Sequence, residues 1–230
     1  VSRSPNVTWQ ESCLSRARRW RALGAPGATV WLTGLPASGK STIGAALEER
    51  LVSAGRLAYL LDGDNLRHGI CGDLGFSAED RARNIARVAE VAQLFADAGA
   101  IAIVALVSPI ASSRRAARRL HERSGLRFIE VFLDTPLEVC IARDPKHLYA
   151  RARAGEIDGF TGVDGPYERP SRAQLVLTDE LGPSAAVDAV LELLQASDES
   201  AAGDRPAPPE RQNQPLGPSG TTHRQNGVQR

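Results

Sequence analysis

One octapeptide has the residue types and the spacing needed to hold a chain of phosphates. Residues 34–41 read Gly-Leu-Pro-Ala-Ser-Gly-Lys-Ser and match the pattern G-x-x-x-x-G-K-[ST] at every fixed position. Glycines at 34 and 39 allow the backbone to turn tightly, so that its N–H groups face the phosphates, and the helix expected from about residue 40 adds its positive dipole end. Lys40 would reach the β- and γ-phosphates, and the Ser41 hydroxyl would ligate Mg²⁺. The nucleotide-binding residues are expected to be Gly34, Leu35, Pro36, Ala37, Ser38, Gly39, Lys40, Ser41 and Thr42.

A pair of carboxylates follows the next strand-like run, in Asp-Gly-Asp-Asn-Leu-Arg-His at residues 62–68. Beside a phosphate loop, one carboxylate can hold Mg²⁺, in part through water, and the other can accept a proton from an attacking hydroxyl. We expect Asp62 to be the metal-side residue and Asp64 to be the base. The alternative is a helix N-cap cluster, because Asp and Asn also begin helices.

The elements that must position these groups are apolar runs that alternate with helical stretches. Strands are predicted at residues 28–33, 57–61, 101–107, 128–133 and 174–177, and helices at residues 41–54, 78–98, 112–124 and 185–196. The strands are continuous apolar runs, which is typical of a parallel sheet covered on both faces. The pattern predicts an α/β fold of the P-loop NTPase type, with five parallel strands and ligands at the carboxyl ends of the strands.

Composition limits the classes of partner. The chain has 230 residues and a formal net charge of +1, so we expect neither nucleic acid nor a membrane as a partner. No apolar run reaches membrane-spanning length. The three cysteines, Cys13, Cys71 and Cys140, are widely spaced, which favours a reducing, cytoplasmic compartment without disulfides or a zinc site.

A series of short motifs, in order along residues 6–182, resembles the adenylyl-sulfate kinase family. Besides the phosphate loop, the matching pieces are Asn6–Trp9, Asp62–Arg67, Leu74–Ser77, Asp80–Arg81, Asn84–Ile85, Ser108–Pro109, Phe128–Val131, Arg143–Lys146, Leu148–Tyr149, Arg153–Ile157, Gly159–Gly162 and Pro166–Glu168. Each piece is weak alone, and the specificity lies in the whole series. The resemblance implies that MgATP phosphorylates the ribose 3′-hydroxyl of adenylyl sulfate (adenosine 5′-phosphosulfate), giving 3′-phosphoadenylyl sulfate for sulfate assimilation.

The resemblance also implies a binding site for the acceptor. Residues matching Arg67, Arg81 and Asn84 hold the phosphosulfate, and forked guanidinium groups suit such an anion. Phenylalanines matching Phe76 and Phe160 sandwich the adenine, and both lie in glycine-rich loops here. For the two arginines the alternative is a solvated surface charge.

Further assignments rest on the resemblance alone. Lys146 is placed near the acceptor, with a solvated lysine as the alternative, and Arg143 near the base or phosphates of ATP. Ser108 matches a serine assigned a phosphoenzyme intermediate, but it has no evident base beside it in sequence and could instead cap the helix that follows. The chain departs from the family at Ile110, where an aromatic residue is usual, and at His147, where glycine is usual.

Three segments are expected. Residues 1–27 would form a leader with one helix capped by Ser12, and residues 28–196 a P-loop kinase domain whose lid spans about 143–170. Residues 197–230 are rich in polar residues, proline and glycine and are predicted to be disordered. We expect the arginines at 114, 115, 118 and 119 to form a solvated helix face paired with neighbouring acids.

Two alternatives remain: a P-loop kinase with another nucleotide or metabolite as acceptor, and a non-catalytic nucleotide-binding module. A homodimer and functional coupling to an ATP sulfurylase on another chain are also expected.

Overall fold

The computed structural model describes residues 6–8, 10 and 12–202, with side chains described as far as residue 196. Five strands and eight helices follow one another in this part of the chain. In chain order they are α1 (Arg16–Ala22), β1 (Ala28–Gly34), α2 (Lys40–Ser53), β2 (Ala58–Asp62), α3 (Gly63–Leu66), α4 (Ala78–Ala98), β3 (Ile101–Ala105), α5 (Ala111–Arg123), β4 (Arg127–Asp134), α6 (Leu137–Arg143), α7 (Leu148–Arg153), β5 (Leu175–Thr178) and α8 (Pro183–Ala202).

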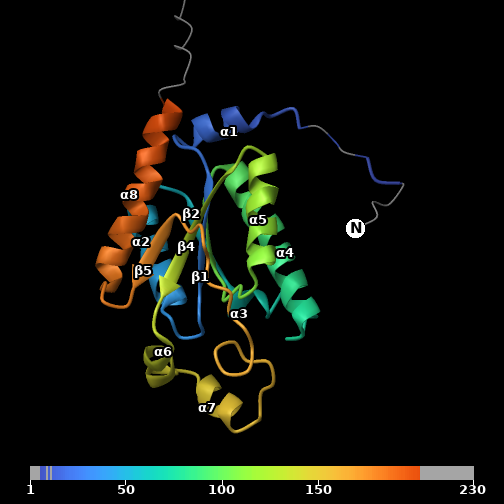
Figure 1. Ribbon diagram of the computed structural model, residues 1–230. Helices are drawn as coiled ribbons and strands as arrows, with labels where there is room; N and C mark the ends of the chain where they lie inside the picture. Colours follow the sequence, from blue (N-terminus) through green and yellow to red (C-terminus); the bar gives the residue numbers. More distant parts are fainter. Residues whose placement is uncertain (1–5, 9, 11, 203–230) are drawn as a thin grey trace, which may run out of the picture.

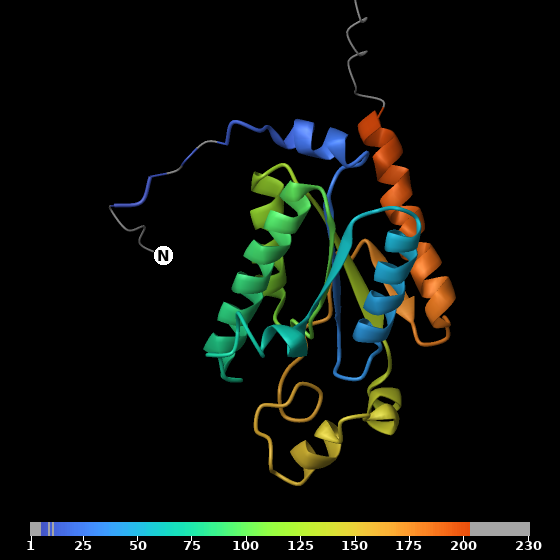
Figure 2. The same ribbon diagram turned by 180° about the vertical axis from the view of Figure 1, so that it is seen from behind.

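The strands form one parallel sheet in the order β2-β3-β1-β4-β5. Helices α2 and α8 cover one face and α4 and α5 the other, and α1 lies across the end of the sheet opposite the lid (Figures 1 and 2). The chain first builds β2 and β3 on one side of β1 and then crosses to β4 and β5 on the other. The strand order therefore reverses at β1, whose carboxyl end carries the phosphate loop, and ligands bind at such reversal points.

Two apolar layers explain why the strands are apolar on both faces. One layer packs the sheet against α2 and α8, and the other packs it against α4 and α5. All seven residues of β1 and all five of β3 are buried. Burial of apolar surface stabilises the fold by roughly 25 cal/mol for every Å² removed from water. Packing on both faces therefore holds the strands in place, and with them the strand ends that carry the site.

The predicted sheet and the main helices are confirmed, and α4 has the predicted bounds. Its ends explain this, because the Ser77 side chain accepts a hydrogen bond from the backbone N–H of Asp80, and Gly99 ends the helix at φ 108°. The prediction did not include the short helices α3, α6 and α7, and β3 ends at Ala105 rather than at residue 107.

Both ends of the described chain differ from prediction. Ser15, not Ser12, caps α1. Helix α8 continues to Ala202 rather than ending at 196, so the tail prediction was wrong for its first residues. The rest of the predicted tail, residues 203–230, lies outside the described residues, as does Trp9 of the first matching motif. Within the described part of the chain, no helix is long and apolar enough to cross a membrane.

A buried histidine makes the stability of the domain sensitive to pH. His121 is fully buried, its Nδ1 donates to the Ala117 carbonyl (2.8 Å), and its Nε2 accepts from the Thr29 hydroxyl (2.9 Å). Burial lowers the pKa of His121 from its usual value of 6.5. The unfolded chain therefore binds more protons than the folded chain below that value, so stability is full above about pH 6.5 and falls as the pH drops.

We expect the free energy of unfolding, measured by urea titration, to fall between about pH 7 and pH 5 by about 1.4 kcal/mol for each unit of pKa depression crossed. The variant His121→Gln removes the titrating group and should show a shallower slope over the same range. Equal slopes in the two proteins would contradict the assignment.

Candidate active site

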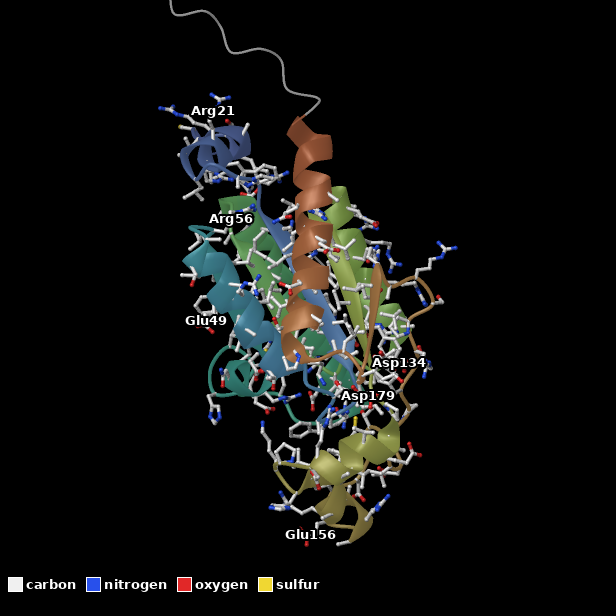
Figure 3. All side chains as sticks on the ribbon, turned by 90° about the vertical axis from the view of Figure 1, so that its left-hand side faces the viewer. Arg21, Glu49, Arg56, Asp134, Glu156 and Asp179 are labelled. Atoms are coloured by element: carbon white, nitrogen blue, oxygen red, sulfur yellow. The ribbon has the colours of Figure 1, made fainter. Side chains whose placement is uncertain are left out.

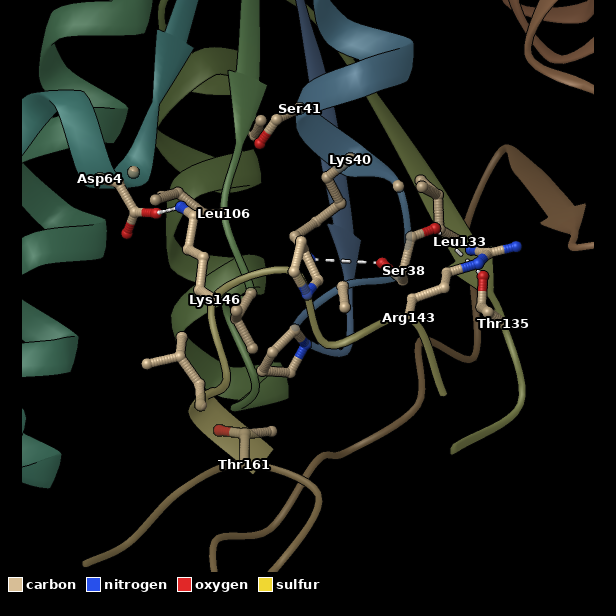
Figure 4. Close-up of a pocket in the computed structure, with 18 of the residues that line it drawn as sticks. Ser38, Lys40, Ser41, Asp64, Leu106, Leu133, Thr135, Arg143, Lys146 and Thr161 are labelled. Carbon is tan, nitrogen blue, oxygen red and sulfur yellow. Dashed lines mark hydrogen bonds and ion pairs between the residues drawn. The ribbon is translucent and has the colours of Figure 1, made fainter. Parts of the chain in front are cut away.

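A large cleft opens at the carboxyl ends of the strands, between the sheet and the segment 143–170 (Figure 4). Its volume is about 1120 Å³, somewhat above the range of roughly 300–1,000 Å³ that is usual for small-ligand sites. Its walls include all the residues expected at the site other than Gly34 and Leu35, namely Pro36, Ala37, Ser38, Gly39, Lys40, Ser41, Thr42, Asp62, Asp64, Arg67, Phe76, Arg81, Asn84, Ser108, Arg143, Lys146 and Phe160.

The phosphate loop joins β1 to α2 in a conformation that depends on its glycines. A Cβ on Gly34 would lie 2.8 Å from the Leu133 carbonyl oxygen, and Gly39 has φ 100°. The Nζ atom of Lys40 donates to the carbonyls of Gly34 (3.0 Å) and Leu35 (2.6 Å) and to Ser38 Oγ (3.3 Å). Burial lowers the pKa of Lys40 to about 8. The lysine is therefore held by three oxygens of its own loop.

Ser41 and Asp62 meet across the gap between α2 and β2. The Ser41 hydroxyl donates to Asp62 Oδ2 (2.6 Å), while Asp62 Oδ1 accepts from the backbone N–H of Asp64 (3.0 Å) and so caps α3. The alternative interpretation of this cluster as a helix cap thus holds for Asp62. The second carboxylate oxygen of Asp62 still faces the phosphate loop. Oxygen donors of this kind suit Mg²⁺, which keeps several waters and phosphate oxygens as ligands. No group of three or more His, Cys, Asp or Glu side chains in the described chain could hold a metal by itself.

Asp64 forms an ion pair with Lys146 across the mouth of the cleft (Figure 4). Both side chains are more than 60% exposed, at 67% and 62%. The hydrogen bond to Asp64 raises the pKa of Lys146. An exposed pair like this adds little to stability. Its significance is its position, because it joins the segment 143–170 to the end of β2.

Arg67, at the end of α3, and Arg81, near the start of α4, both lie beside the exposed ring of Phe76. The Arg67 guanidinium lies 4.2 Å from the Phe76 ring centroid, and its Nη1 donates to the carbonyls of Leu74 (2.9 Å) and Gly75 (3.0 Å). Arg81 crosses the cleft instead. Its Nη2 donates to the Gly159 carbonyl (2.7 Å), its Nη1 to Thr161 Oγ1 (3.0 Å) and its Nε to the Phe76 carbonyl (2.9 Å).

Phe160 is buried, although its glycine-rich surroundings suggested an accessible ring. It packs edge-on against Tyr149, with ring centroids 5.1 Å apart, in a small apolar cluster with Cys140 and Ala152. Phe76 is 66% exposed. Both rings line the cleft.

Asn84 has an unsatisfied polar atom in the cleft wall. The residue is 6% exposed, and its Oδ1 is buried without a hydrogen-bond partner. Buried polar atoms almost always have partners, so an unpaired one beside a cleft indicates a place for a ligand. Because amide oxygen and nitrogen are assigned rather than observed, either atom could serve the ligand.

Ser108 lies in a buried network of hydrogen bonds. Its Oγ accepts from Trp31 Nε1 (3.1 Å) and donates to Thr33 Oγ1 (2.8 Å), and its backbone has φ 40°. None of these partners is a base, and serine needs one to act as a nucleophile. The geometry supports a structural role, and the phosphoserine intermediate stays a prediction.

The variant Ser108→Ala separates the two roles. If the serine only supports the turn, the variant should keep most of the wild-type kcat and should unfold more readily by about 1–2 kcal/mol, because Trp31 and Thr33 lose their partner. Loss of all turnover in a folded variant, together with acid-stable labelling of the wild type from γ-labelled ATP, would establish the covalent role.

One expectation for the surrounding segments changes, and one departure from the family pattern has a structural counterpart. Arg114 is 2% exposed and paired with Glu130, so it is not part of a solvated face, although Arg115 and Arg119 are exposed as expected. His147 does adopt a left-handed turn, with φ 54°, where the family usually has glycine.

Several residues of the cleft were not predicted. The Tyr149 hydroxyl donates to the Pro36 carbonyl (3.1 Å) and ties α7 to the phosphate loop, and Thr135 Oγ1 donates to the Ser38 carbonyl (3.1 Å). Asp179, in the loop after β5, also lines the cleft and is labelled in Figure 3. Tyr149 stood in a matching motif, but no pattern in the sequence distinguished the other two.

Comparison with known proteins places this site in a family. The sequence profile of adenylylsulphate kinase matches residues 26–178. Adenylyl-sulfate kinase 3 of Arabidopsis thaliana is 49% identical over 199 residues, which span 85% of this chain and 95% of that protein. The chain belongs to the adenylyl-sulfate kinase family. The adenylyl-sulfate kinase of Clostridium acetobutylicum is 50% identical over 194 residues, spanning 84% of this chain and 96% of that protein.

A solved structure of the same family agrees in fold. The Mycobacterium tuberculosis APS kinase CysC, in complex with AMPPNP and APS, is 50% identical and has a TM-score of 0.73 over 74% of this chain and 98% of that chain. The predicted family, the enzyme class of ATP-using phosphotransferase and the P-loop fold are thereby confirmed.

Proposed function

We propose that this chain transfers the γ-phosphoryl group of ATP to the ribose 3′-hydroxyl of adenylyl sulfate, with the residues of the cleft in the roles given below. One observation carries the proposal: residues 36–42 of the phosphate loop and a set of groups suited to a second, anionic nucleotide line the same cleft. A volume of about 1120 Å³ gives room for two nucleotides. In the Mycobacterium tuberculosis relative, an ATP analogue and APS are bound together.

On the ATP side, backbone N–H groups of residues 34–42 cradle the phosphates, and Lys40 leaves the loop carbonyls to bind the β- and γ-phosphates. Ser41 and Asp62 would hold Mg²⁺, which when bound supplies positive charge beside the transferred group. Arg143 lines the cleft, and we expect it near the base or phosphates of ATP. In such transfers the protein contributes mainly by placing groups and stabilising charge, so Lys40 is expected to have the largest effect.

On the acceptor side, Asp64 takes the proton of the 3′-hydroxyl as it attacks. Arg67, Arg81 and Asn84 hold the phosphosulfate, and each already borders the cleft with donors or an unpaired amide. Phe76 stacks on the adenine from one side, and Phe160 presents its edge or face from the other. Stacking of this kind contributes roughly 1–3 kcal/mol per base. Lys146, paired with Asp64 here, lies close to the same acceptor.

The segment 143–170 serves as the lid. It meets the sheet side through Lys146 and Asp64, through Arg81 and Gly159, and through Tyr149 and Pro36. These contacts join residues that are 78 to 113 positions apart in the chain. The lid that they hold excludes water, which would otherwise accept the phosphoryl group.

The deciding experiment measures ADP release from MgATP with adenylyl sulfate as acceptor, and with AMP as the matched control. Fast turnover with the sulfate and little with AMP is the expected result. Turnover that does not depend on the sulfate would point to a different acceptor. Binding of ATP without turnover on either would indicate a non-catalytic module and would contradict the proposal.

Assembly and location stay predictions. A relative from Thiobacillus denitrificans, 29% identical, forms a hexamer. For this chain we propose a homodimer in the cytoplasm, coupled to an ATP sulfurylase on another chain. Light scattering tests the homodimer. Channelling of adenylyl sulfate in a mixture with the sulfurylase tests the coupling.

A further inference from the structure

The chain that leaves the lid is fixed to the body of the domain by hydrogen bonds and a ring contact. The backbone N–H of Glu168 donates to the Pro109 carbonyl (2.9 Å), and its Oε2 accepts from the backbone N–H of Ala111 (2.7 Å). Just before it, the Tyr167 hydroxyl meets Thr33 Oγ1 (3.0 Å), and its ring stacks on Phe132 with centroids 5.9 Å apart. Residues 167–168, which we call the lid root, therefore contact β1, β4 and the turn before α5.

Arg114 lies at the centre of this junction and makes a separate bond to each part. Its Nη2 donates to the Glu168 carbonyl (2.6 Å), its Nη1 to the Ser108 carbonyl (2.6 Å) and its Nε to Glu130 Oε1 (2.8 Å). Its guanidinium also lies 5.7 Å from the Tyr167 ring centroid. The side chain is 2% exposed. One planar group thus joins the lid root, the cleft wall at Ser108 and strand β4.

Glu130 is the reason that a guanidinium can be buried here. The carboxylate is 8% exposed, and its second oxygen accepts from Arg118 Nη2 (3.1 Å). A buried charge is tolerated only when it is paired and its donors are used. The fork of an arginine supplies three directed donors to three different elements, which the single ammonium group of a lysine cannot reproduce.

The bond to Ser108 has a local effect as well. Ser108 has φ 40°, a conformation that non-glycine residues adopt only when the surroundings hold them there. Its carbonyl is fixed by Arg114 and its hydroxyl by Thr33 and Trp31. Ser108 and Pro109 line the cleft, so the same arginine sets both the wall of the site and the end of the lid.

We propose that Arg114 is a positioning residue, which fixes the lid root and the Ser108–Pro109 wall so that the lid closes in one register and excludes water. The inference rests on the proposed function, because water exclusion matters only where phosphoryl transfer to a bound acceptor competes with hydrolysis. Arg114 does not itself touch the reacting atoms. Its loss therefore alters the fidelity of transfer as well as the rate.

The test compares transfer with hydrolysis in three variants. Arg114→Lys keeps a positive charge beside Glu130 but loses the fork. Glu168→Ala and Tyr167→Phe each remove one side-chain contact of the lid root and leave the Arg114–Glu130 pair intact, so they keep the test valid if Arg114→Lys folds poorly. Arg115→Gln, on the exposed face of the same helix, is the matched control.

Two quantities are measured for each folded variant: ADP formed per molecule of adenylyl sulfate phosphorylated, and hydrogen exchange of the lid amides at residues 155–165 with AMPPNP bound. We expect transfer to fall roughly 10- to 100-fold in Arg114→Lys, as for a misplacement of about 1 Å. The ratio of ADP to product should rise above one, and the lid amides should exchange faster. Smaller changes in the same direction are expected for the two lid-root variants, and none for Arg115→Gln.

The inference is overturned if folded variants form one ADP per molecule of adenylyl sulfate phosphorylated and their lid amides exchange as in the wild type, whatever happens to the rate of transfer. A failure of the proposed function looks different. In that case the wild type itself does not phosphorylate adenylyl sulfate, while the exchange of the lid amides in the variants still reports whether Arg114 anchors the lid.

Discussion

Replacing Lys40 by methionine is expected to lower the rate of phosphoryl transfer on the order of 10³-fold without unfolding the protein. The ammonium of Lys40 is the protein's own positive charge in the phosphate loop, and transfer depends on charge stabilisation around the moving phosphoryl group. Its present partners are three oxygens of the same loop, so no other element depends on it for its position.

Stability should move in the opposite direction from activity. Burial lowers the pKa of Lys40 to about 8, which means that the fold disfavours the charged form of this side chain. Methionine has a similar shape and no charge, so Lys40→Met should unfold at a temperature equal to or above that of the wild type. Residues kept for function at the expense of stability show this combination.

Steady-state kinetics and thermal unfolding of the same preparation check both parts, with AMPPNP binding measured separately. Lys40→Arg is the useful control, because it keeps the charge but places it differently, and it should also be impaired. A Lys40→Met protein that retains a tenth or more of the wild-type kcat would show that the lysine does not stabilise the transferred group.

The sheet and the phosphate loop could be predicted because their signals are local. Apolar runs such as residues 28–33 must be buried on both faces. The pattern of the phosphate loop includes the two glycines, Gly34 and Gly39, that its backbone conformation requires. Helix α4 was predicted with its bounds because Ser77 and Gly99 mark its ends directly. Where residues at both ends of a helix mark its start and its end, the sequence is sufficient to predict the bounds of the helix.

Residues whose environment is set by distant partners could not be predicted in the same way. Arg114 looks like its neighbours on an arginine-rich helix, and only Glu130 and Glu168, from other elements, make it a buried junction. Ser108 resembled a cap or a nucleophile until Trp31 and Thr33 were placed beside it. The burial of Phe160 depends on Tyr149, which the prediction did not place.

The short helix of the lid, α7, was missed for a related reason. Helix α7 has only six residues, and isolated helices of that length are unstable in water. It forms because Tyr149 and Ala152 pack into a cluster with Phe160, and because the Asp144 carboxylate accepts from the backbone N–H of Ala150 (3.1 Å). Such helices are made by tertiary contacts, and periodicity alone does not reveal them.

Asp64→Asn is the second change for which we expect a large effect, a fall in kcat on the order of 10²–10⁴-fold. Asparagine has the shape of aspartate but cannot accept the proton of the attacking hydroxyl. The fold should not change, because Asp62, not Asp64, caps α3, and the Asp64 side chain is 67% exposed. Kinetics with adenylyl sulfate as the varied substrate, together with circular dichroism, measure the two effects.

The pair with Lys146 provides the control that separates catalysis from loss of the ion pair. Lys146→Met breaks the same contact between lid and sheet but keeps the carboxylate, so it should raise the KM for adenylyl sulfate more than it lowers kcat. Asp64→Asn should show the reverse, with kcat falling far more than KM rises. If the two variants lose kcat equally, the contact itself is what matters, and Asp64 is not the base. If only Asp64→Asn loses kcat, the carboxylate acts on the reacting hydroxyl, and the ion pair with Lys146 is not required for turnover.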